Sequence, residues 1–229
     1  MRALNVTTSW LASAARLGFG MFTGELGARP EKPLVLYEFE ACPFCRRVRE
    51  ALTILDLPAE IRPCPKGGTR FRTEAVARSG RSQFPFLVDP NTDVQLLESG
   101  DIIEYLFATY GSGSPPLSLS LPLFITSSQL STAFRITRGR NARPSVGAEQ
   151  PLELYGFEAS PYVRLAREAL CELELPYIAL PVGKRSPRRE EFLQRSGRVM
   201  VPWLHDPNTG RSMHESAAIV AYLNETYGT

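Results

Sequence analysis

The stretch at residues 33–58 reads PLVLYEFEACPFCRRVREALTILDLP, and residues 151–176 repeat it as PLELYGFEASPYVRLAREALCELELP. Sixteen of the 26 aligned positions are identical. The match resumes at residues 84–92, FPFLVDPNT, which align with residues 201–209, VPWLHDPNT. A sequence pattern that recurs over this length indicates two copies of one structural unit. We therefore expect two domains of the same fold.

Each copy alternates between strand and helix patterns. In the first copy, four short apolar runs predict strands, at residues 34–37, 59–62, 84–88 and 94–97. Apolar residues at helical spacing predict a helix over 42–55, a polar helix is expected around 70–78, and a last helix is expected to start at the cap Ser99. The order β-α-β-α-β-β-α in under a hundred residues describes an α/β unit, a small sheet with helices packed on it.

Two segments outside these copies also match each other. Residues 9–16, SWLASAAR, align with residues 128–135, SQLSTAFR. We therefore expect a short bracing helix before each copy, in preference to a targeting peptide at the N-terminus. The expected division is a lead-in with the first bracing helix at residues 1–32, the first domain at 33–111, a linker with the second bracing helix at 112–150, and the second domain at 151–229.

The composition is that of an ordinary globular protein. Of the 229 residues, 43% are hydrophobic and 22% are charged, and the net charge is +2. A charge so close to neutral gives no electrostatic argument for nucleic acid or an anionic membrane as the main partner. No apolar run approaches the roughly 20 residues of a membrane span. Four cysteines, two of them solitary, favour a reducing compartment, and we expect the cytoplasm.

Two cysteines at the start of the first helix are the candidate catalytic residues. Cys42 is expected at the N-cap, with a proline at the first helical position, and Cys45 lies one turn further along. The helix N-terminus favours a thiolate, and exposed Arg46, Arg47 and Arg49 are expected to add positive charge. Cys42 is therefore the expected nucleophile, and Cys45 is placed to attack a mixed disulfide formed there.

The same two-residue spacing also occurs in zinc sites, which need a second pair of ligands. Cys64 and Cys171 are single and distant in sequence, and the histidines are His205 and His214. We therefore favour a redox pair and expect no metal site. Neither Cys64 nor Cys171 has a helix N-terminal position that would activate its thiol, so both are interpreted as small core or surface residues.

The motifs together resemble a known family. The CPFC tetrad opening a helix, Phe84-Pro85 before a strand and Glu98-Ser99 at the last helix resemble glutaredoxins and the N-terminal domain of glutathione S-transferases. The tetrad is also similar to that of the second type of membrane-associated prostaglandin E synthase, and the tandem form to duplicated proteins of photosynthetic organisms. The resemblance implies two tandem thioredoxin-like domains and, in a photosynthetic eukaryote, allows the chloroplast stroma as a location.

The resemblance also implies glutathione as a ligand. Pro85 would be a cis-proline facing the nucleophile, and the backbone of Phe84 would pair with the cysteinyl part of glutathione. Glu98 and Ser99 would bind its γ-glutamyl end, and a helix N-terminus is a suitable carboxylate site. Phe44, within the tetrad, is assigned to the same site.

Two departures from the family bear on activity. Glu40 occupies the stretch where many glutaredoxins place a lysine, and it is expected to oppose both thiolate formation and an anionic ligand. The helical C-terminal domain that holds the electrophile in true transferases is absent from the pattern. We therefore expect reduction of disulfides or glutathione mixed disulfides, in proteins or small molecules, over conjugation by a glutathione transferase.

The second copy keeps the strand and helix pattern of the first copy but lacks its two active-site thiols. Ser160 replaces Cys42 and Val163 replaces Cys45, so disulfide chemistry is excluded there. The matching positions define a second candidate site, made of Ser160, Tyr162, Val201, Pro202, Glu215 and Ser216. Either the Ser160 hydroxyl donates to a bound glutathione thiolate, or this copy is a scaffold in which Ser160 caps the helix, which is the interpretation we favour.

The sequence is also compatible with a different class of function, a binding or scaffold protein. The tandem grooves could hold a partner, an iron–sulfur cluster or haem, with Cys42 and a glutathione thiol as cluster ligands. A coloured protein would indicate this alternative.

Overall fold

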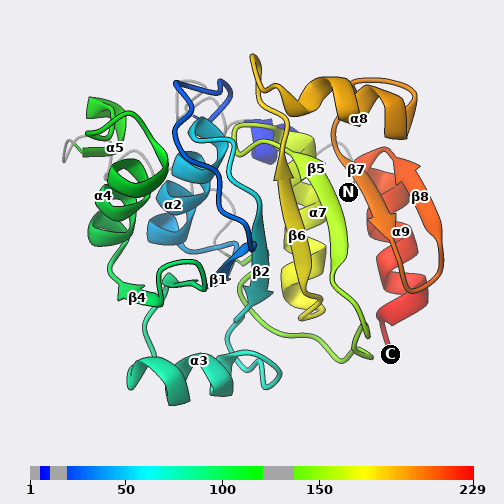
Figure 1. Ribbon diagram of the computed structural model, residues 1–229. Helices are drawn as coiled ribbons and strands as arrows, with labels where there is room; N and C mark the ends of the chain where they lie inside the picture. The colour runs from blue at the N-terminus through cyan, green and yellow to red at the C-terminus, as the bar shows by residue number, and fades with distance from the viewer. Residues whose placement is uncertain (1–5, 11–19, 121–136) are drawn as a thin grey trace.

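A computed structural model of the chain describes residues 6–10, 20–120 and 137–229. The first copy contains, in order, β1 (Leu34–Glu38), α2 (Pro43–Ile54), β2 (Ala59–Pro63), α3 (Arg72–Ser79), β3 (Phe86–Asp89), β4 (Val94–Leu97) and α4 (Ser99–Tyr110), followed by the short α5 (Leu117–Ser120). The second contains β5 (Leu152–Gly156), α7 (Pro161–Glu172), β6 (Tyr177–Pro181), α8 (Arg188–Ser196), β7 (Trp203–Asp206), β8 (Arg211–His214) and α9 (Ser216–Tyr227). The expected order of elements is confirmed in both copies, which are tandem thioredoxin-like domains (Figure 1).

The two copies share one sheet. Its strand order is β4-β3-β1-β2-β6-β5-β7-β8, with β1–β2 and β5–β6 parallel and the other pairs antiparallel. The copies join where β2 pairs with β6, with Glu60 opposite Ile178. These two residues occupy equivalent positions in the repeat, so the pairing relates the copies by an approximate two-fold axis. Figure 1 shows this junction at the middle of the sheet.

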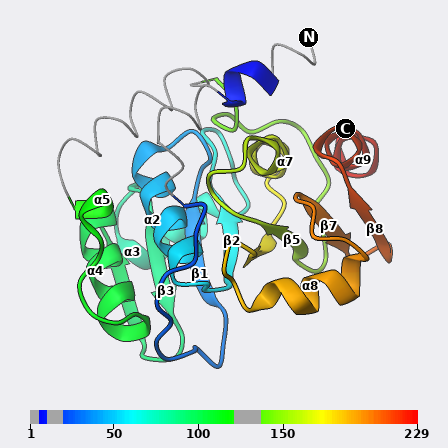
Figure 2. The same cartoon turned by 90° about the horizontal axis from the view of Figure 1, so that it is seen from above.

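The helices form two unequal layers. A single hydrophobic core runs through both copies and contains residues of α2, α4, α7 and α9, so these four helices cover the same face of the sheet (Figure 2). Smaller clusters lie on the opposite face. Tyr37 packs with Ala75 of α3 in the first copy, and Tyr155 packs with Phe192 of α8 in the second. Burial of this continuous core is what stabilises the pair of domains as one body.

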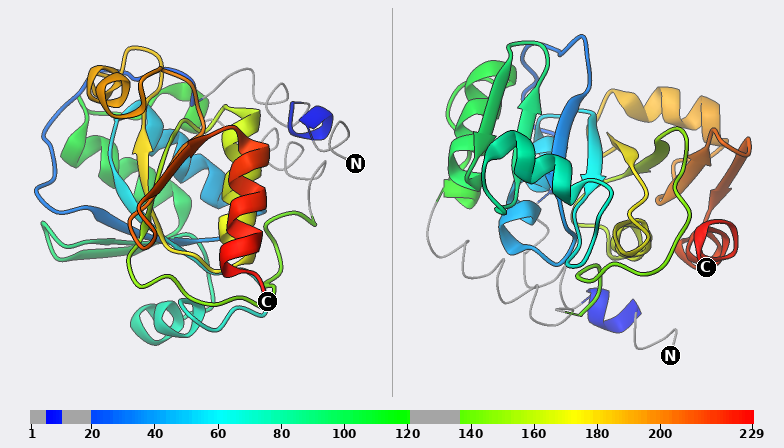
Figure 3. Two further views of the ribbon diagram at one scale, coloured as in Figure 1. Left: turned by 90° about the vertical axis from the view of Figure 1, so that its right-hand side faces the viewer. Right: turned by 90° about the horizontal axis from the view of Figure 1, so that it is seen from below.

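The segment that precedes each copy contacts the other copy. Residues 6–10 are helical and lie against α7 of the second copy, where the Ser9 hydroxyl donates to the Pro161 carbonyl at 2.6 Å (Figure 3). The Gly20 carbonyl accepts from Ala159 N at 3.2 Å, and the equivalent Gly139 carbonyl accepts from Ala41 N at 3.3 Å. The first bracing helix is thus confirmed in its described part, whereas residues 124–135, where the second was expected, lie outside the described residues.

Buried charged residues from both copies meet near the approximate axis. Arg49 lies 3.2 Å from Glu40 and 2.9 Å from Glu158, and the equivalent Arg167 lies 2.9 Å from each of the same two carboxylates. Arg49 also contacts Glu38. All five side chains are at most 6% exposed. We call these five residues the interface cluster.

Two details differ from the sequence expectations. The strand expected at residues 84–88 begins at Phe86, the first of its residues that pairs with β1 and β4. Ser99 is the first residue of α4 and Glu98 is its N-cap, with φ of 66° and no capping hydrogen bond from its side chain. None of the helices in the described ranges combines the length and apolarity needed to cross a bilayer.

Candidate functional site

Cys42 lies where β1 is succeeded by α2. It is the N-cap of α2, with extended backbone, and its Sγ accepts the Cys45 N–H at 3.2 Å. Its thiol donates to the Phe84 carbonyl at 3.8 Å. The Phe84–Pro85 peptide bond is cis, as the resemblance implies. The fold therefore brings together four residues that the sequence assigned to one site.

The two thiols differ in acidity. A hydrogen bond from the Cys45 thiol lowers the pKa of Cys42, burial opposes this, and the N–H groups of Cys45 and Phe44 lower the pKa further. Burial and the bond to Cys42 hold the pKa of Cys45 well above its usual value. Cys42 is 3% exposed and Cys45 is fully buried. Cys42 is thus the stronger candidate for the thiolate, and Cys45 is the protonated neighbour.

The arginines of α2 do not form the exposed cluster expected around Cys42. Arg46, Arg47 and Arg49 are 3%, 7% and 5% exposed. Arg49 belongs to the interface cluster, and Arg46 lies 3.4 Å from Glu158. The expectation was wrong because Glu158 of the other copy pairs with Arg46 and Arg49, and the Ser99 hydroxyl and the Leu119 carbonyl accept from Arg47, so that none of the three guanidinium groups faces solvent.

The expectation that Glu40 opposes thiolate formation at Cys42 was wrong, because arginines pair with this carboxylate. Glu40 is paired with Arg49 and Arg167, so its charge is balanced within the interface cluster. The carboxylate that raises the pKa of Cys42 is Glu38, at the end of β1.

The Glu98-Ser99 pair lies at the start of α4. Ser99 is buried, and its hydroxyl accepts a hydrogen bond from Arg47 at 3.0 Å. Glu98 is exposed, and its carboxylate accepts from the Gln83 side chain. Sequence reasoning missed Arg47 and Gln83 at this site, because the spacing of α2 shows only that Arg47 is one turn from Cys42 and nothing marks Gln83.

Aromatic rings form the wall beside the thiols. Phe44 is 43% exposed, and Phe39 meets Phe84 edge to face at 6.2 Å between ring centroids. The Arg72 guanidinium lies 4.8 Å from the Phe84 ring centroid and donates to the Cys64 carbonyl at 2.9 Å. Arg72 was also missed, since the sequence places it only within a polar helix.

The remaining cysteines are core residues. Cys64 packs in the same apolar cluster as Cys42 and Cys45, and burial raises its pKa. Cys171 is buried, and its thiol donates to the Gly139 carbonyl at 3.3 Å. Among the described residues there is no group of three or more His, Cys, Asp or Glu side chains that could hold a metal ion. The iron–sulfur and haem alternative finds no support in the structure.

The second copy reproduces the N-cap, the cis-proline and the start of the last helix of the first copy. Ser160 is the N-cap of α7, and its hydroxyl accepts the Val163 N–H at 3.3 Å. The Val201–Pro202 peptide bond is cis. Glu215 precedes α9 with φ of 73°, and Ser216 is its first residue, so both match their counterparts in the first copy.

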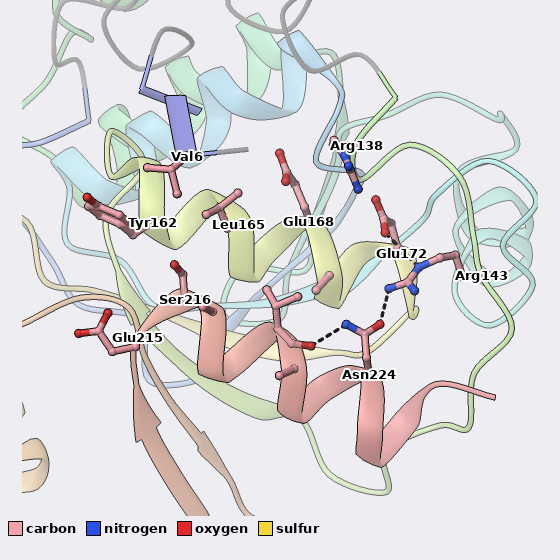
Figure 4. Close-up of a pocket in the computed structure, with 14 residues that line it drawn as sticks. Val6, Arg138, Arg143, Tyr162, Leu165, Glu168, Glu172, Glu215, Ser216 and Asn224 are labelled. Carbon is pink, nitrogen blue, oxygen red and sulfur yellow. Dashed lines mark hydrogen bonds and ion pairs between the residues drawn. The ribbon is translucent and has the colours of Figure 1, made fainter. Parts of the chain in front are cut away.

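A cavity of about 560 Å³ lies between α7 and α9 (Figure 4). Tyr162 and Leu165 of α7 and Ser216 and Val220 of α9 are among its lining residues, and Tyr162 and Glu215 lie toward one end. At the other end, Arg143 donates to Asn224 at 2.8 Å and pairs with Glu172 at 3.0 Å. Three of the six candidates of the second copy, Tyr162, Glu215 and Ser216, therefore line one cavity. Leu165 stands at the position that Arg47 holds in the first copy.

A family model described as "Glutathione S-transferase, N-terminal domain" matches residues 36–115 and 154–229. A glutathione S-transferase-like protein of Aspergillus terreus, gedE, is 34% identical over 79 residues, which are 34% of each chain. A glutathione S-transferase-like protein of Aspergillus fumigatus, tpcF, is 28% identical over 130 residues, 57% of this chain and 56% of that protein. The chain thus spans from a third to just over half of the length of these relatives.

Two solved structures are also similar. A glutathione transferase of Bombyx mori is 26% identical, covers 37% of this chain and 39% of its own, and has a TM-score of 0.33. The trimeric glutathione transferase TDR1 of Leishmania is 16% identical, covers 84% of this chain and 66% of its own, and has a TM-score of 0.28. The family model covers most of both copies, and none of these matches addresses the finer similarity to prostaglandin E synthase.

Proposed function

The chain belongs to the glutathione S-transferase N-terminal domain family and carries that domain twice, and we propose that its first copy is a glutathione-linked thiol-disulfide oxidoreductase. The observation that carries the proposal is the position of the Cys42 sulfur. It lies at the N-terminus of α2, 3.2 Å from Cys45 N and 3.8 Å from the Phe84 carbonyl. The helix N-terminus and the Cys45 N–H stabilise a sulfur at this position as a thiolate.

The proposed reaction has two thiol exchanges. The Cys42 thiolate attacks the glutathione sulfur of a mixed disulfide, the substrate leaves as a thiolate, and glutathione stays on Cys42. Cys45 then attacks Cys42, which releases glutathione and leaves a Cys42–Cys45 disulfide for two further glutathione molecules to reduce. The substrates are disulfides of a protein or a small molecule.

The Phe84 carbonyl supports this proposal. In the thiol form it accepts the Cys42 S–H, and ionisation of Cys42 removes that donor. The carbonyl is then free to pair with a backbone N–H of the incoming glutathione. Glu98, Ser99 and Arg47 at the start of α4 would bind the γ-glutamyl end, where the helix N-terminus and the guanidinium favour a carboxylate.

The test compares three proteins in the glutathione-coupled reduction of a small mixed disulfide. Cys42→Ser is expected to abolish activity, whereas Cys45→Ser is expected to retain part of it, because free glutathione can replace the resolving thiol. Cys171→Ser, a buried thiol on α7, serves as the matched control. Equal activity of the wild type and Cys42→Ser would overturn the proposal.

A second candidate function is glutathione conjugation at the second copy. The cavity beside Tyr162, Glu215 and Ser216 favours it, because a site of this volume, with apolar residues of α7 and α9 beside charged ones in its lining, can hold a small electrophile next to glutathione. Ser160 would then donate to the glutathione thiolate. Turnover of a chromogenic electrophile that falls on Ser160→Ala and persists in Cys42→Ser would support it, and absence of turnover would refute it.

A further inference from the structure

One histidine of the second copy has a hydrogen-bond acceptor at each of its ring nitrogens. His214 is the last residue of β8, and its Nδ1 lies 3.0 Å from the Met200 carbonyl oxygen. Its Nε2 lies 3.2 Å from the carbonyl oxygen of Ser196, the last residue of α8. A neutral imidazole carries one N–H and can donate to only one of these carbonyls, whereas an imidazolium carries two. Both hydrogen bonds therefore form only when His214 is protonated.

The surroundings of the ring are compatible with a positive charge. The Ser196 carbonyl ends α8, where helix carbonyls lack partners within the helix and form the negative end of its dipole. The ring itself lies near Phe192 and Trp203, with centroids 6.5 Å and 6.4 Å away. The charged and titratable groups of the elements around it are Glu153 and Tyr155 of β5, Glu191 and Arg195 of α8, Arg198 after α8, His205 of β7, and Glu215.

The first copy makes the corresponding connection without a histidine. Gln83 is the equivalent of Met200, and its side-chain amide donates to Glu98 at the start of the last helix. Leu97 is the equivalent of His214. Methionine has no N–H or O–H in its side chain, so the amide of the first copy is replaced by an imidazole that reaches the same loop from β8. The connection thus depends on a protonated side chain in the second copy alone.

This histidine joins the two halves of the second candidate site. Met200 directly precedes Val201 and its cis-proline, and His214 directly precedes the Glu215-Ser216 pair at the start of α9. We propose that protonated His214 is a positioning residue of the glutathione site in the second copy, an inference that rests on the second candidate function. Its two hydrogen bonds fix the loop that carries Val201 to the strand that leads into α9. Loss of the proton releases one of the two carbonyls and loosens that loop.

The ring N–H protons of His214 test the two hydrogen bonds directly, because the chain contains only two histidines. In proton NMR of the wild type at about pH 5, we expect two slowly exchanging N–H signals from this ring, and one at about pH 8, since histidines change charge in this range. The signals should persist in His205→Gln and vanish in His214→Leu, which introduces the side chain that the first copy has. A single His214 signal at about pH 5 would overturn the proposal.

The role in the site is tested with the chromogenic electrophile. The KM for glutathione of His214→Leu is divided by that of the wild type at the same pH, which removes the pH dependence of the glutathione thiol. We expect this ratio to be about ten at about pH 6 and near one at about pH 8, because only the protonated ring makes both bonds. An equal ratio at the two pH values would show that His214 acts only in packing and would overturn the proposal.

His205→Gln is the matched control for the kinetics. His205 stacks on the same Trp203 ring, and its Nδ1 contacts the Ser212 hydroxyl at 2.8 Å, away from the loop. Its KM ratio is expected to be near one at both pH values. Absence of turnover in the wild type would refute the second candidate function, and the positioning role with it. Turnover together with a single His214 N–H signal in acid would refute the positioning role alone, so the two failures are distinguishable.

Discussion

Arg167 of the second copy lies 2.9 Å from Glu40 of the first, and both side chains are at most 5% exposed. This contact closes a ring, since Glu40 also contacts Arg49, Arg49 contacts Glu158, and Glu158 contacts Arg167. The charges of the two copies therefore neutralise each other only when β2 and β6 are paired. The ring makes the docking of the copies specific, because separating them would leave buried charges unpaired.

Arg167→Met is expected to destabilise the whole chain. The substitution removes one of the arginines that pair with the buried Glu40 and Glu158. Removing one partner of a buried ion pair lowers the free energy of unfolding by about 3–5 kcal/mol. Urea unfolding followed by circular dichroism measures the loss. Arg195→Met is the control, because Arg195 pairs with Glu153 at a site about one-third exposed and should cost about 1 kcal/mol or less. Equal losses of unfolding free energy in the two variants would contradict a stabilising role of Arg167 in the buried ring of charges.

The stability of the protein should fall in acid through Glu158. Burial alone would raise its pKa, but Arg167, Arg49, Arg46 and Arg164 together lower it to about 2, against an ordinary 4.5. A carboxyl with a depressed pKa stabilises the fold fully above its unfolded pKa. That contribution, ~3 kcal/mol, is lost as the pH falls from about 4.5 to 2.

Urea midpoints measured between pH 2 and 6 test this. In Glu158→Gln the urea midpoint should fall less between pH 4.5 and 2 than in the wild type. Glu190→Gln changes an exposed residue in the first turn of α8, and its midpoint should fall as in the wild type. If the midpoint of Glu158→Gln falls as much as that of the wild type, other carboxylates cause the loss of stability in acid.

The internal repeat made the elements and the first thiol predictable. Helical spacing and a proline at the first turn located the N-cap Cys42, and the family motif placed Phe84 beside it. The sequence did not reveal that β2 pairs with β6. That pairing brings together residues more than a hundred positions apart, and neither strand pattern carries a signal for its neighbour.

The error over the arginines has the same origin. Arg46 and Arg49 were expected to be exposed because charged residues on a helix usually are. Their partner Glu158 comes from the other copy, which no local pattern reveals. A signal was nevertheless present, since both arginines and Glu40 recur in the second copy although the thiols do not. Charged residues retained without the chemistry indicate a structural role for them.

The acidity of Cys42 should depend on Cys45. The hydrogen bond from the Cys45 thiol is the largest contribution that lowers the pKa of Cys42. Alkylation of the wild type should therefore follow a thiolate that forms below the ordinary thiol pKa of about 8.5. Cys45→Ala should move the midpoint of the alkylation rate to higher pH. Cys64→Ala is the control, and a midpoint that is the same in Cys45→Ala and the wild type would contradict the role of this bond.

Arg47 provides the last prediction, which concerns ligand binding. Its guanidinium donates to the Ser99 hydroxyl and to the Leu119 carbonyl, and therefore lies at the N-terminus of α4. A cation and a helix N-terminus together favour a carboxylate. Arg47→Leu should weaken glutathione binding by about tenfold, which corresponds to ~1.4 kcal/mol.

Calorimetry in a Cys42→Ser background excludes mixed disulfides from the measurement of glutathione affinity. Arg198→Leu, an exposed arginine that follows α8, is the control for a change of charge. Leu119→Ala separates the two contacts of Arg47, because it loosens the packing of α5 and keeps the guanidinium. If Leu119→Ala weakens binding as much as Arg47→Leu does, Arg47 acts by holding α5. If only Arg47→Leu does so, the guanidinium itself contributes to the glutathione site.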